Sequence, residues 1–179
     1  MIPHRIGKIS ASDYGCCAST LSSCCPSEEE SAFILSILES EELRGVAIKS
    51  RQGALGFALV SHDLKGTFFP KSLSTRKEVD MLEEAEHQDE NVLALQGIYV
   101  EPRLQKQGLG KEIISSLESF YPKSTWLALV EENNLIAKAF FLSCGFVDKG
   151  PISYAERGIA PHLFVKKYRP FGLCREAKW

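Results

Sequence analysis

Residues 93–120 read LALQGIYVEPRLQKQGLGKEIISSLESF and decide the fold, because they predict a strand, a glycine-rich turn and a helix in succession. Apolar, β-branched and aromatic residues run up to Val100. Pro102 cannot donate to a sheet ladder, so we expect the strand to end at Glu101. Apolar residues then recur at helical spacing and indicate one buried face. They are Leu109, Ile113, Ile114, Leu117 and Phe120.

The turn has the features of an anion-binding loop. The first N–H groups of a helix have no partner inside it, and they carry the positive end of the helix dipole. Gly108 and Gly110 lack a Cβ, so an anion can approach the backbone closely, and Lys106 and Lys111 add positive charge. A tight strand-to-helix turn without a ligand would also use glycines, and spacing alone leaves both interpretations open.

Two common glycine motifs are excluded by single positions. A Walker loop requires Ser or Thr after Gly-Lys, but Glu112 follows Gly110-Lys111. A dinucleotide fingerprint starting at Gly108 requires a third glycine where this chain has Ile113.

Composition predicts one soluble globular domain over residues 1–179. The chain is 44% hydrophobic and 25% charged, and its formal net charge of −2 argues against a general nucleic-acid binder. No run approaches the roughly 18 apolar residues of a membrane helix. The N-terminus MIPHRIGKIS lacks a signal-peptide core, so a cytoplasmic location is the default expectation.

The six cysteines predict neither a metal site nor a disulfide framework. Cys16-Cys17 and Cys24-Cys25 are adjacent pairs, and Cys144 and Cys174 are distant from them. No ligand spacing of the zinc type is present, and we expect no metal. Buried or half-buried thiols are the better interpretation.

Upstream of the central stretch we expect two helices and a hairpin. The expected elements are a strand over 4–10, a helix over 14–24, a second helix that begins near Glu28–Glu30, and hairpin strands over 44–51 and 54–62. Residues 63–91 then form a long polar insertion with a candidate helix over 76–87. The insertion is either a lid on the substrate side or a surface excursion.

Downstream, the apolar run over 125–130 predicts a strand near the middle of the sheet. Asn133 or Asn134 starts a helix to Ser143, and Gly145 is a natural C-terminal cap. Late strands are expected over 146–147, 152–155 and 162–168. This order of elements predicts an α/β sandwich.

Two motifs in this order resemble the GNAT superfamily of acyl-CoA-dependent N-acetyltransferases. The first is Gln105-x-x-Gly108-x-Gly110 after a strand that ends Ile98-Tyr99-Val100-x-Pro102. The second is Asn134-x-x-Ala137-x-x-Phe140-Phe141-x-x-x-Gly145-Phe146. The resemblance implies a mixed, mostly antiparallel central sheet with helices on both faces. It also implies acetyl-CoA as co-substrate.

The resemblance implies which residues would hold that co-substrate. Backbone groups of Ile98, Tyr99 and Val100 would pair with the pantetheine arm. Backbone amides would hold the pyrophosphate, and they belong to Gln105, Lys106, Gln107, Gly108, Leu109, Gly110 and Lys111. Asn134 would contact the co-substrate through its side chain, although a helix N-cap is its alternative role. Ala137 and Phe141 share a helical face and would border the co-substrate.

The sequence departs from the family at the catalytic positions. Family members commonly carry a Glu early on the central strand as base and a Tyr on the later helix as acid; these positions hold Ala94 and Phe141. The local candidates for catalysis are Tyr99, Gln96 and Cys144, with Glu90 just before the strand. Ordering of the two reactants could supply much of the rate.

We therefore expect an N-acetyltransferase that acts on a primary amine of a small molecule or a protein, as a monomer or homodimer, with no nucleic-acid or membrane partner. A small polyamine, an amino acid, an antibiotic and a protein N-terminus all remain open as acceptors. A non-catalytic acyl-CoA-binding module is the main alternative. A nucleotide-phosphate binder would rest on the loop alone.

Overall fold

The computed structural model describes residues 3–24, 32, 35, 36, 38, 44–51, 53–62, 91–152 and 161–168. Seven strands within them form one sheet in the order β1-β2-β3-β4-β5-β7-β6. β4 and β5 are parallel, and the other neighbouring pairs are antiparallel. The strands are β1 Arg5–Lys8, β2 Arg44–Ser50, β3 Gly53–Ser61, β4 Asn91–Val100, β5 Ser124–Val130, β6 Val147–Pro151 and β7 His162–Lys166. The predicted mixed, mostly antiparallel sheet is confirmed.

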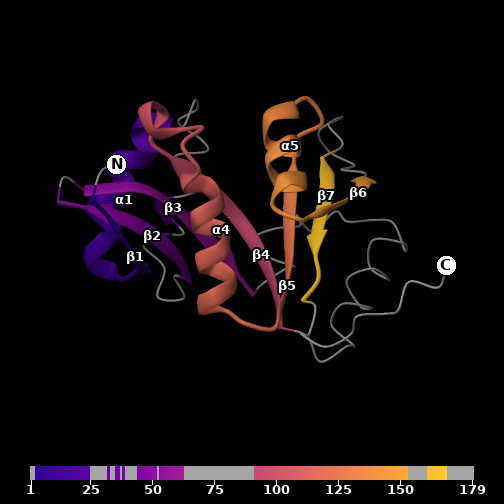
Figure 1. Cartoon of the computed structure of the whole chain (residues 1–179), viewed down its shortest axis with the longest axis horizontal. Coiled ribbons are helices and arrows are strands. Elements are labelled where there is room, and N and C mark those ends of the chain that lie inside the picture. The colour runs from indigo at the N-terminus through magenta and orange to yellow at the C-terminus, as the bar shows by residue number, and fades with distance from the viewer. Residues whose placement is uncertain are drawn as a thin grey trace.

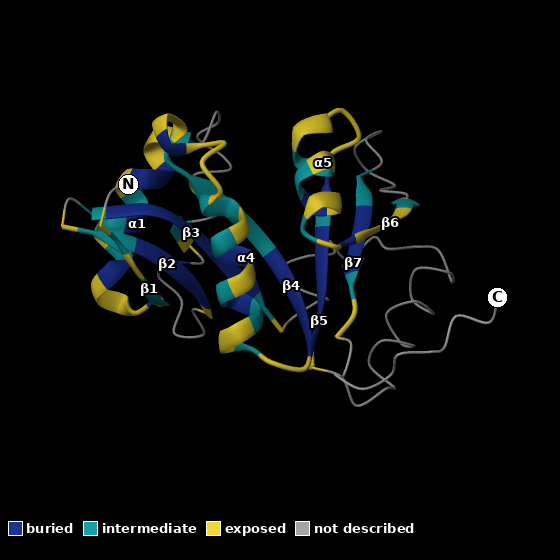
Figure 2. Ribbon diagram, viewed as in Figure 1, coloured by how far each residue is buried: buried dark blue, intermediate teal, exposed yellow. Residues whose placement is uncertain are grey.

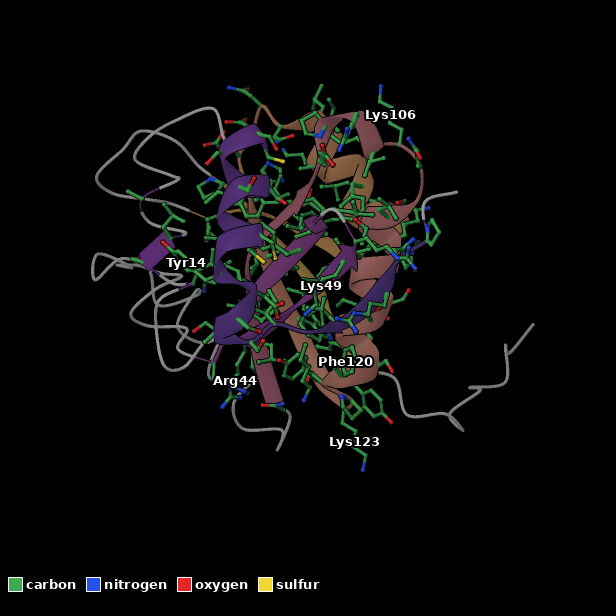
Figure 3. The ribbon with its side chains drawn as sticks, turned by 90° about the vertical axis from the view of Figure 1, so that its left-hand side faces the viewer. Tyr14, Arg44, Lys49, Lys106, Phe120 and Lys123 are labelled. Carbon is green, nitrogen blue, oxygen red and sulfur yellow. The ribbon has the colours of Figure 1, made fainter. Side chains whose placement is uncertain are left out.

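Helices cover both faces of this sheet, as predicted (Figure 1). Leu21 of α1 packs with Phe57 on one face, whereas Ile113 of α4 and Phe141 of α5 share a cluster on the other face. Figure 3 shows α1 and α4 on opposite sides of the strands. The helices are α1 Tyr14–Cys24, α4 Leu109–Phe120 and α5 Leu135–Ser143.

The predicted apolar face of α4 is the face that enters the core. Ile113, Ile114 and Leu117 are buried, Leu109 is half-buried, and Phe120 at the helix end is exposed. Figure 2 shows the central strands buried along most of their length and the outward face of α4 exposed. Burial of one helical stripe against a sheet is what stabilises such a layered arrangement.

The last part of the sheet differs from the prediction. A short strand over 146–147 was expected, but β6 runs from Val147 to Pro151, and Ile152, the described residue of the strand expected over 152–155, lies outside it. The Asp148 carboxylate accepts hydrogen bonds from Gly150 N at 2.8 Å and from His162 Nδ1 at 2.9 Å. These bonds lie where the register against β7 shifts between Asp148 and Pro151, and the strand continues through Gly150 and ends at Pro151.

Several predictions lie outside the described residues, including the insertion over 63–90, its candidate helix, and residues 153–155. Of the predicted second helix, residues 32, 35, 36 and 38 are described and all are helical. Among the described cysteines, Cys16, Cys17 and Cys144 have free thiols. No helix in the described ranges is long and apolar enough to cross a membrane.

Candidate functional site

β4 and β5 run side by side at one end and separate at the other (Figure 1). Their parallel register begins with Asn91 opposite Ser124 and ends with Leu95 opposite Ala128. β4 then continues to Val100, and its residues 97–100 pair with β3 on the other side. We call this separation the divergence of β4 and β5. It leaves a backbone edge of β4 without a strand partner among the described residues, and an extended ligand can pair with such an edge.

A β-bulge lies where the divergence begins. Leu59 of β3 is opposite Gly97, but the next residue, Val60, is opposite Leu95. Gln96 is therefore the extra residue on β4. Bulges redirect side chains and backbone groups, and they are frequent next to active sites.

The bulge changes which side chains of β4 share a face. Leu95 and Ile98 both pack in the cluster on the α4 side of the sheet. Ala94 and Tyr99 both pack on the opposite side, the side that carries α1. Strand alternation places Gln96 on the face of Ala94, and the bulge brings Tyr99 to that same face.

The glycine-rich loop leaves the first turn of α4 open. Lys106 and Gly108 have positive φ angles of 62° and 90°, and no side chain caps the helix at Gly108. Glu112 N donates to Gly108 O at 3.1 Å, so the N–H groups of residues 109–111 precede the first helical bond. Lys106 and Lys111 are exposed beside them. These features fit a pyrophosphate, because free N–H groups, a helix dipole and two cations converge there.

Two glutamines of the glycine-rich loop donate side-chain hydrogen bonds to backbone carbonyls of the protein itself. Gln107 Nε2 donates to Arg103 O, and Gln105 Nε2 donates to Val100 O, both at 3.1 Å. Cys24 Sγ of α1 donates to the same Val100 carbonyl at 3.3 Å. Both acceptor positions of the Val100 carbonyl are thus engaged by side chains.

Ile98 is the residue of the predicted pantetheine-pairing set that best fits that role. Glu101 N donates to Leu55 O, in line with the β3 register. Alternate residues direct their backbone groups to opposite sides of a strand, so those of Tyr99 face β3 and those of Ile98 face the divergence. The pantetheine role stays a prediction for all three residues.

Phe140 of α5 lies against Gly110 in the first turn of α4. A Cβ placed at Gly110 would lie 2.9 Å from Cε2 of Phe140, closer than real Cβ contacts. A side chain at Gly110 would therefore displace the Phe140 ring, and the missing Cβ leaves room for both helices to pack closely. The sequence prediction missed Phe140 and named Phe141, although both fit the helical spacing from Ala137.

Asn134 and Phe141 of the second motif have structural roles, one as a helix N-cap and the other as a buried aromatic side chain in the core. Asn134 Oδ1 accepts a hydrogen bond from Ala137 N at 3.0 Å, which is an N-cap of α5. Phe141 is 5% exposed and packs against Phe146 and Phe164, at ring-centroid distances of 5.0 and 5.8 Å. Ala137 is half-buried beside the same cluster. Co-substrate contact by these motif residues remains a prediction.

Tyr99 leans along β4 toward the bulge. Its ring lies 5.1 Å from Phe57, and its hydroxyl would be 2.7 Å from a Cβ placed at Gly97. Gly97 therefore makes room for the phenol directly beside Gln96. Packing places Tyr99 on the α1 side of the sheet, and strand alternation from Ala94 assigns Gln96, the second of the three predicted catalytic candidates, to the same face.

Cys144, the third candidate, lies elsewhere. It is half-buried at the end of α5 and packs on the α4 side of the sheet, opposite the face of Tyr99. Burial raises the pKa of its thiol above the ordinary value, which favours the protonated form. The two family positions carry no titratable group, and both Ala94 and Phe141 are buried.

The sequence did not predict the two side-chain hydrogen bonds to the Val100 carbonyl. Cys24 and Val100 are far apart in the chain, and no periodicity links them. Gln105 was predicted to act through its backbone amide, which stays a prediction, and its side chain closes the loop onto β4. Within the described ranges, no group of three or more His, Cys, Asp or Glu residues could hold a metal.

Comparison with known proteins agrees with this geometry. The family model described as Acetyltransferase (GNAT) family matches residues 16–146. None of the curated proteins matches the chain.

Solved structures share the fold at low sequence identity. A GNAT-family protein from Desulfovibrio desulfuricans is 13% identical, with a TM-score of 0.70 over 92% of this chain and 99% of that one. The ribosomal-protein-S18-alanine N-acetyltransferase from Escherichia coli is 15% identical, with a TM-score of 0.60 over 91% of each chain. The PaiA N-acetyltransferase from Thermoplasma acidophilum, solved with coenzyme A, is 13% identical, with a TM-score of 0.63 over 93% of this chain and all of that one.

The family model spans most of the chain, from α1 to the end of the second motif, and it includes the divergence and the open helix N-terminus. This chain belongs to the GNAT family of acetyltransferases.

Proposed function

We propose that this protein transfers the acetyl group of acetyl-CoA to a primary amine. The observation that carries the proposal is the open N-terminus of α4 next to the divergence of β4 and β5. The free N–H groups of residues 109–111 and the cations Lys106 and Lys111 suit a pyrophosphate. The unpaired edge at Ile98 suits an extended pantetheine arm.

The chemistry requires a neutral amine next to the thioester carbonyl. The leaving group is a thiolate, and free thiols have a pKa of about 8.5, so it can depart near neutral pH without a strong acid. Tyr99 and Gln96 are the polar side chains that β4 presents on the face of Ala94. Both side chains can position the amine and the thioester without exchanging a proton. Such ordering of two reactants can supply much of the rate.

The acceptor is defined as a class and not as one compound. The Escherichia coli relative is named for the alanine of ribosomal protein S18, which is a protein acceptor. For this chain, a protein N-terminus and a small amine are both compatible with the site, so both belong in a screen.

A non-catalytic acyl-CoA-binding module is the second candidate. Ala94 and Phe141 have no ionisable group, so neither position can supply the acid or base common in the family. Both side chains are buried. Such a module would keep the loop and the open helix N-terminus and would lack turnover.

A screen of amines with acetyl-CoA tests the proposal. The full chain is mixed with polyamines, amino acids, aminoglycosides and N-terminal peptides, and released thiol is recorded against an acceptor-free control. We expect thiol release with at least one amine class, and competition by CoA but not by ATP. Binding of acetyl-CoA with no thiol release from any amine would favour the binding module. Competition by ATP would favour a nucleotide-phosphate site.

A further inference from the structure

We propose that the side-chain amide of Gln96 donates a hydrogen bond to the carbonyl oxygen of the acyl-CoA thioester. The inference rests on the proposed acetyl transfer and assigns one residue to the reacting bond. It makes Gln96 a catalytic residue that recognises a carbonyl without gaining or losing a proton.

Gln96 carries a buried donor that lacks an acceptor. Its Nε2 atom is shielded from solvent, and no hydrogen-bond partner for it exists in the described part of the chain. A buried donor without a partner is unfavourable, and in native proteins such groups usually mark a functional or ligand site. The amide therefore has an unused hydrogen bond to offer.

A second amide on the same strand shows the contrast. Asn91, at the closed end of the β4–β5 pair, donates from Nδ2 to Ser124 Oγ at 3.1 Å. Both side chains are primary amides on β4, yet the one inside the paired region has a partner and the one at the divergence does not. The orphan donor thus coincides with the place where β4 is free to meet an extended ligand.

The position of Gln96 suits a carbonyl group in particular. It is the bulge residue, it follows the last residue paired with β5, and strand alternation from Ala94 assigns it to the face on which Tyr99 packs. Pantetheine that pairs with the edge at Ile98 would present its terminal thioester near this point. Nε2 can only donate, so it selects an acceptor such as a carbonyl oxygen over an ammonium group.

The hydrogen bond would strengthen as the reaction proceeds. The amine nitrogen forms a bond with the carbonyl carbon while the C=O π pair moves onto oxygen, which becomes negatively charged beside Nε2. The C–S bond then breaks, the pair leaves with sulfur, and the C=O bond is restored. The extra proton of the nitrogen leaves through solvent and the thiolate takes one up, so amine and acetyl-CoA give amide and CoA. A donor aimed at such an oxygen typically contributes a factor of about 10²–10³ in rate.

The first test measures the melting temperature of the free protein. Gln96→Met keeps the approximate shape and removes an unsatisfied donor, so we expect an unchanged or higher Tm. Asn91→Leu is the matched control; it removes an amide that has a partner and should lower Tm. A fall for Gln96→Met as large as that for Asn91→Leu would show that the Gln96 amide has a structural role, which overturns the proposal.

The second test measures carbonyl recognition by calorimetry. Acetyl-CoA and S-ethyl-CoA differ mainly in that the thioether has CH₂ where the thioester has C=O. We expect the wild-type protein to bind acetyl-CoA more tightly, and Gln96→Met to bind both with the same Kd. With an acceptor from the amine screen, kcat of Gln96→Met should fall about 100-fold.

The outcomes separate this inference from the proposed function. Wild-type protein that binds neither compound contradicts both. Equal binding of both compounds by the wild-type protein would overturn the Gln96 assignment. A Gln96→Met variant that still prefers acetyl-CoA would overturn it too. Neither result contradicts acetyl transfer. Binding without turnover leaves the calorimetric comparison as the deciding measurement.

Discussion

Two helices, α4 and α5, begin near the divergence of β4 and β5, and their N-termini are treated differently. At α4, Gly108 has no side chain to cap the helix, and the first backbone bond is the one from Glu112 N. At α5, the Asn134 side chain accepts the hydrogen bond of Ala137 N. One helix leaves its first N–H groups without an intrahelical partner or side-chain cap, and the other satisfies one of them with its own chain.

Charge reinforces this difference. Lys106 and Lys111 flank the start of α4, and both are exposed. The first turn of α5 instead exposes Leu135 and Ile136, which are 72% and 83% accessible. An anion should therefore choose α4, although the dipoles of both helices have the same direction relative to their first turns.

The largest expected effect comes from a carboxylate at the second position of each helix. Gly110→Asp places a negative charge among the open N–H groups and should abolish the Tm increase caused by acetyl-CoA. In wild-type protein at 100 times Kd, about 2.7 kcal/mol of stabilisation should raise Tm by roughly 5–10 °C in a domain of this size. Ile136→Asp places the same group at the matching position of α5 and should leave that shift intact.

Gly110→Ala separates charge from bulk. It brings the same Cβ against Phe140 without a carboxylate, so any loss it shares with Gly110→Asp is steric. An equal loss of the acetyl-CoA shift in Ile136→Asp would show that the effect is not specific to the N-terminus of α4.

A medium effect is expected when the cap of α5 is removed. Asn134→Ala should lower the free energy of unfolding by about 1 kcal/mol, whereas Asn134→Ser should retain most of it, because serine also caps helices. Chemical denaturation with an unchanged m-value measures this difference. The Kd for acetyl-CoA then reports on the second predicted role. If Asn134 also contacts acetyl-CoA, binding weakens in the Ser variant even though its stability is kept.

The smallest effect concerns the left-handed residue before α4. Lys106 and Lys123 flank opposite ends of α4, as Figure 3 shows, and have φ angles of 62° and 60°. Glycine adopts this conformation without strain, so each Lys→Gly change should stabilise the fold by up to about 1 kcal/mol. Lys106→Gly should also weaken acetyl-CoA binding a few-fold by removing a cation. A matching loss in Lys123→Gly would indicate a general charge effect rather than a local one.

Much of the fold was predictable because each element has a local cause. Pro102 ended β4 near the expected residue, and the apolar spacing from Leu109 placed the buried face of α4 correctly. The late strands were predicted less well. A strand over 146–147 was expected, but β6 covers Val147–Pro151, and the contact between Asp148 and His162 beside it joins residues that no local pattern relates.

The candidate site was predictable in its loop and not in its contacts. Gly108 and Gly110 were identified from spacing, and the structure gives them a left-handed turn and a close helix contact. The partner in that contact, Phe140, and the double use of the Val100 carbonyl required the packed structure. No sequence motif indicates which buried donor lacks an acceptor, so the sequence could not predict that Gln96 Nε2 has no hydrogen-bond partner in the described part of the chain.

By itself, the sequence determined the order of elements, the glycine-rich turn and the family, because hydrophobic period, proline and glycine act on the chain locally. Only the tertiary structure decided the site's geometry: where β4 leaves β5, which residue the bulge inserts, and which helix N-terminus stays open. These features depend on register between strands and on contacts between distant segments. Such pairings are selected by the packing of the whole sheet, and no short window of sequence contains them.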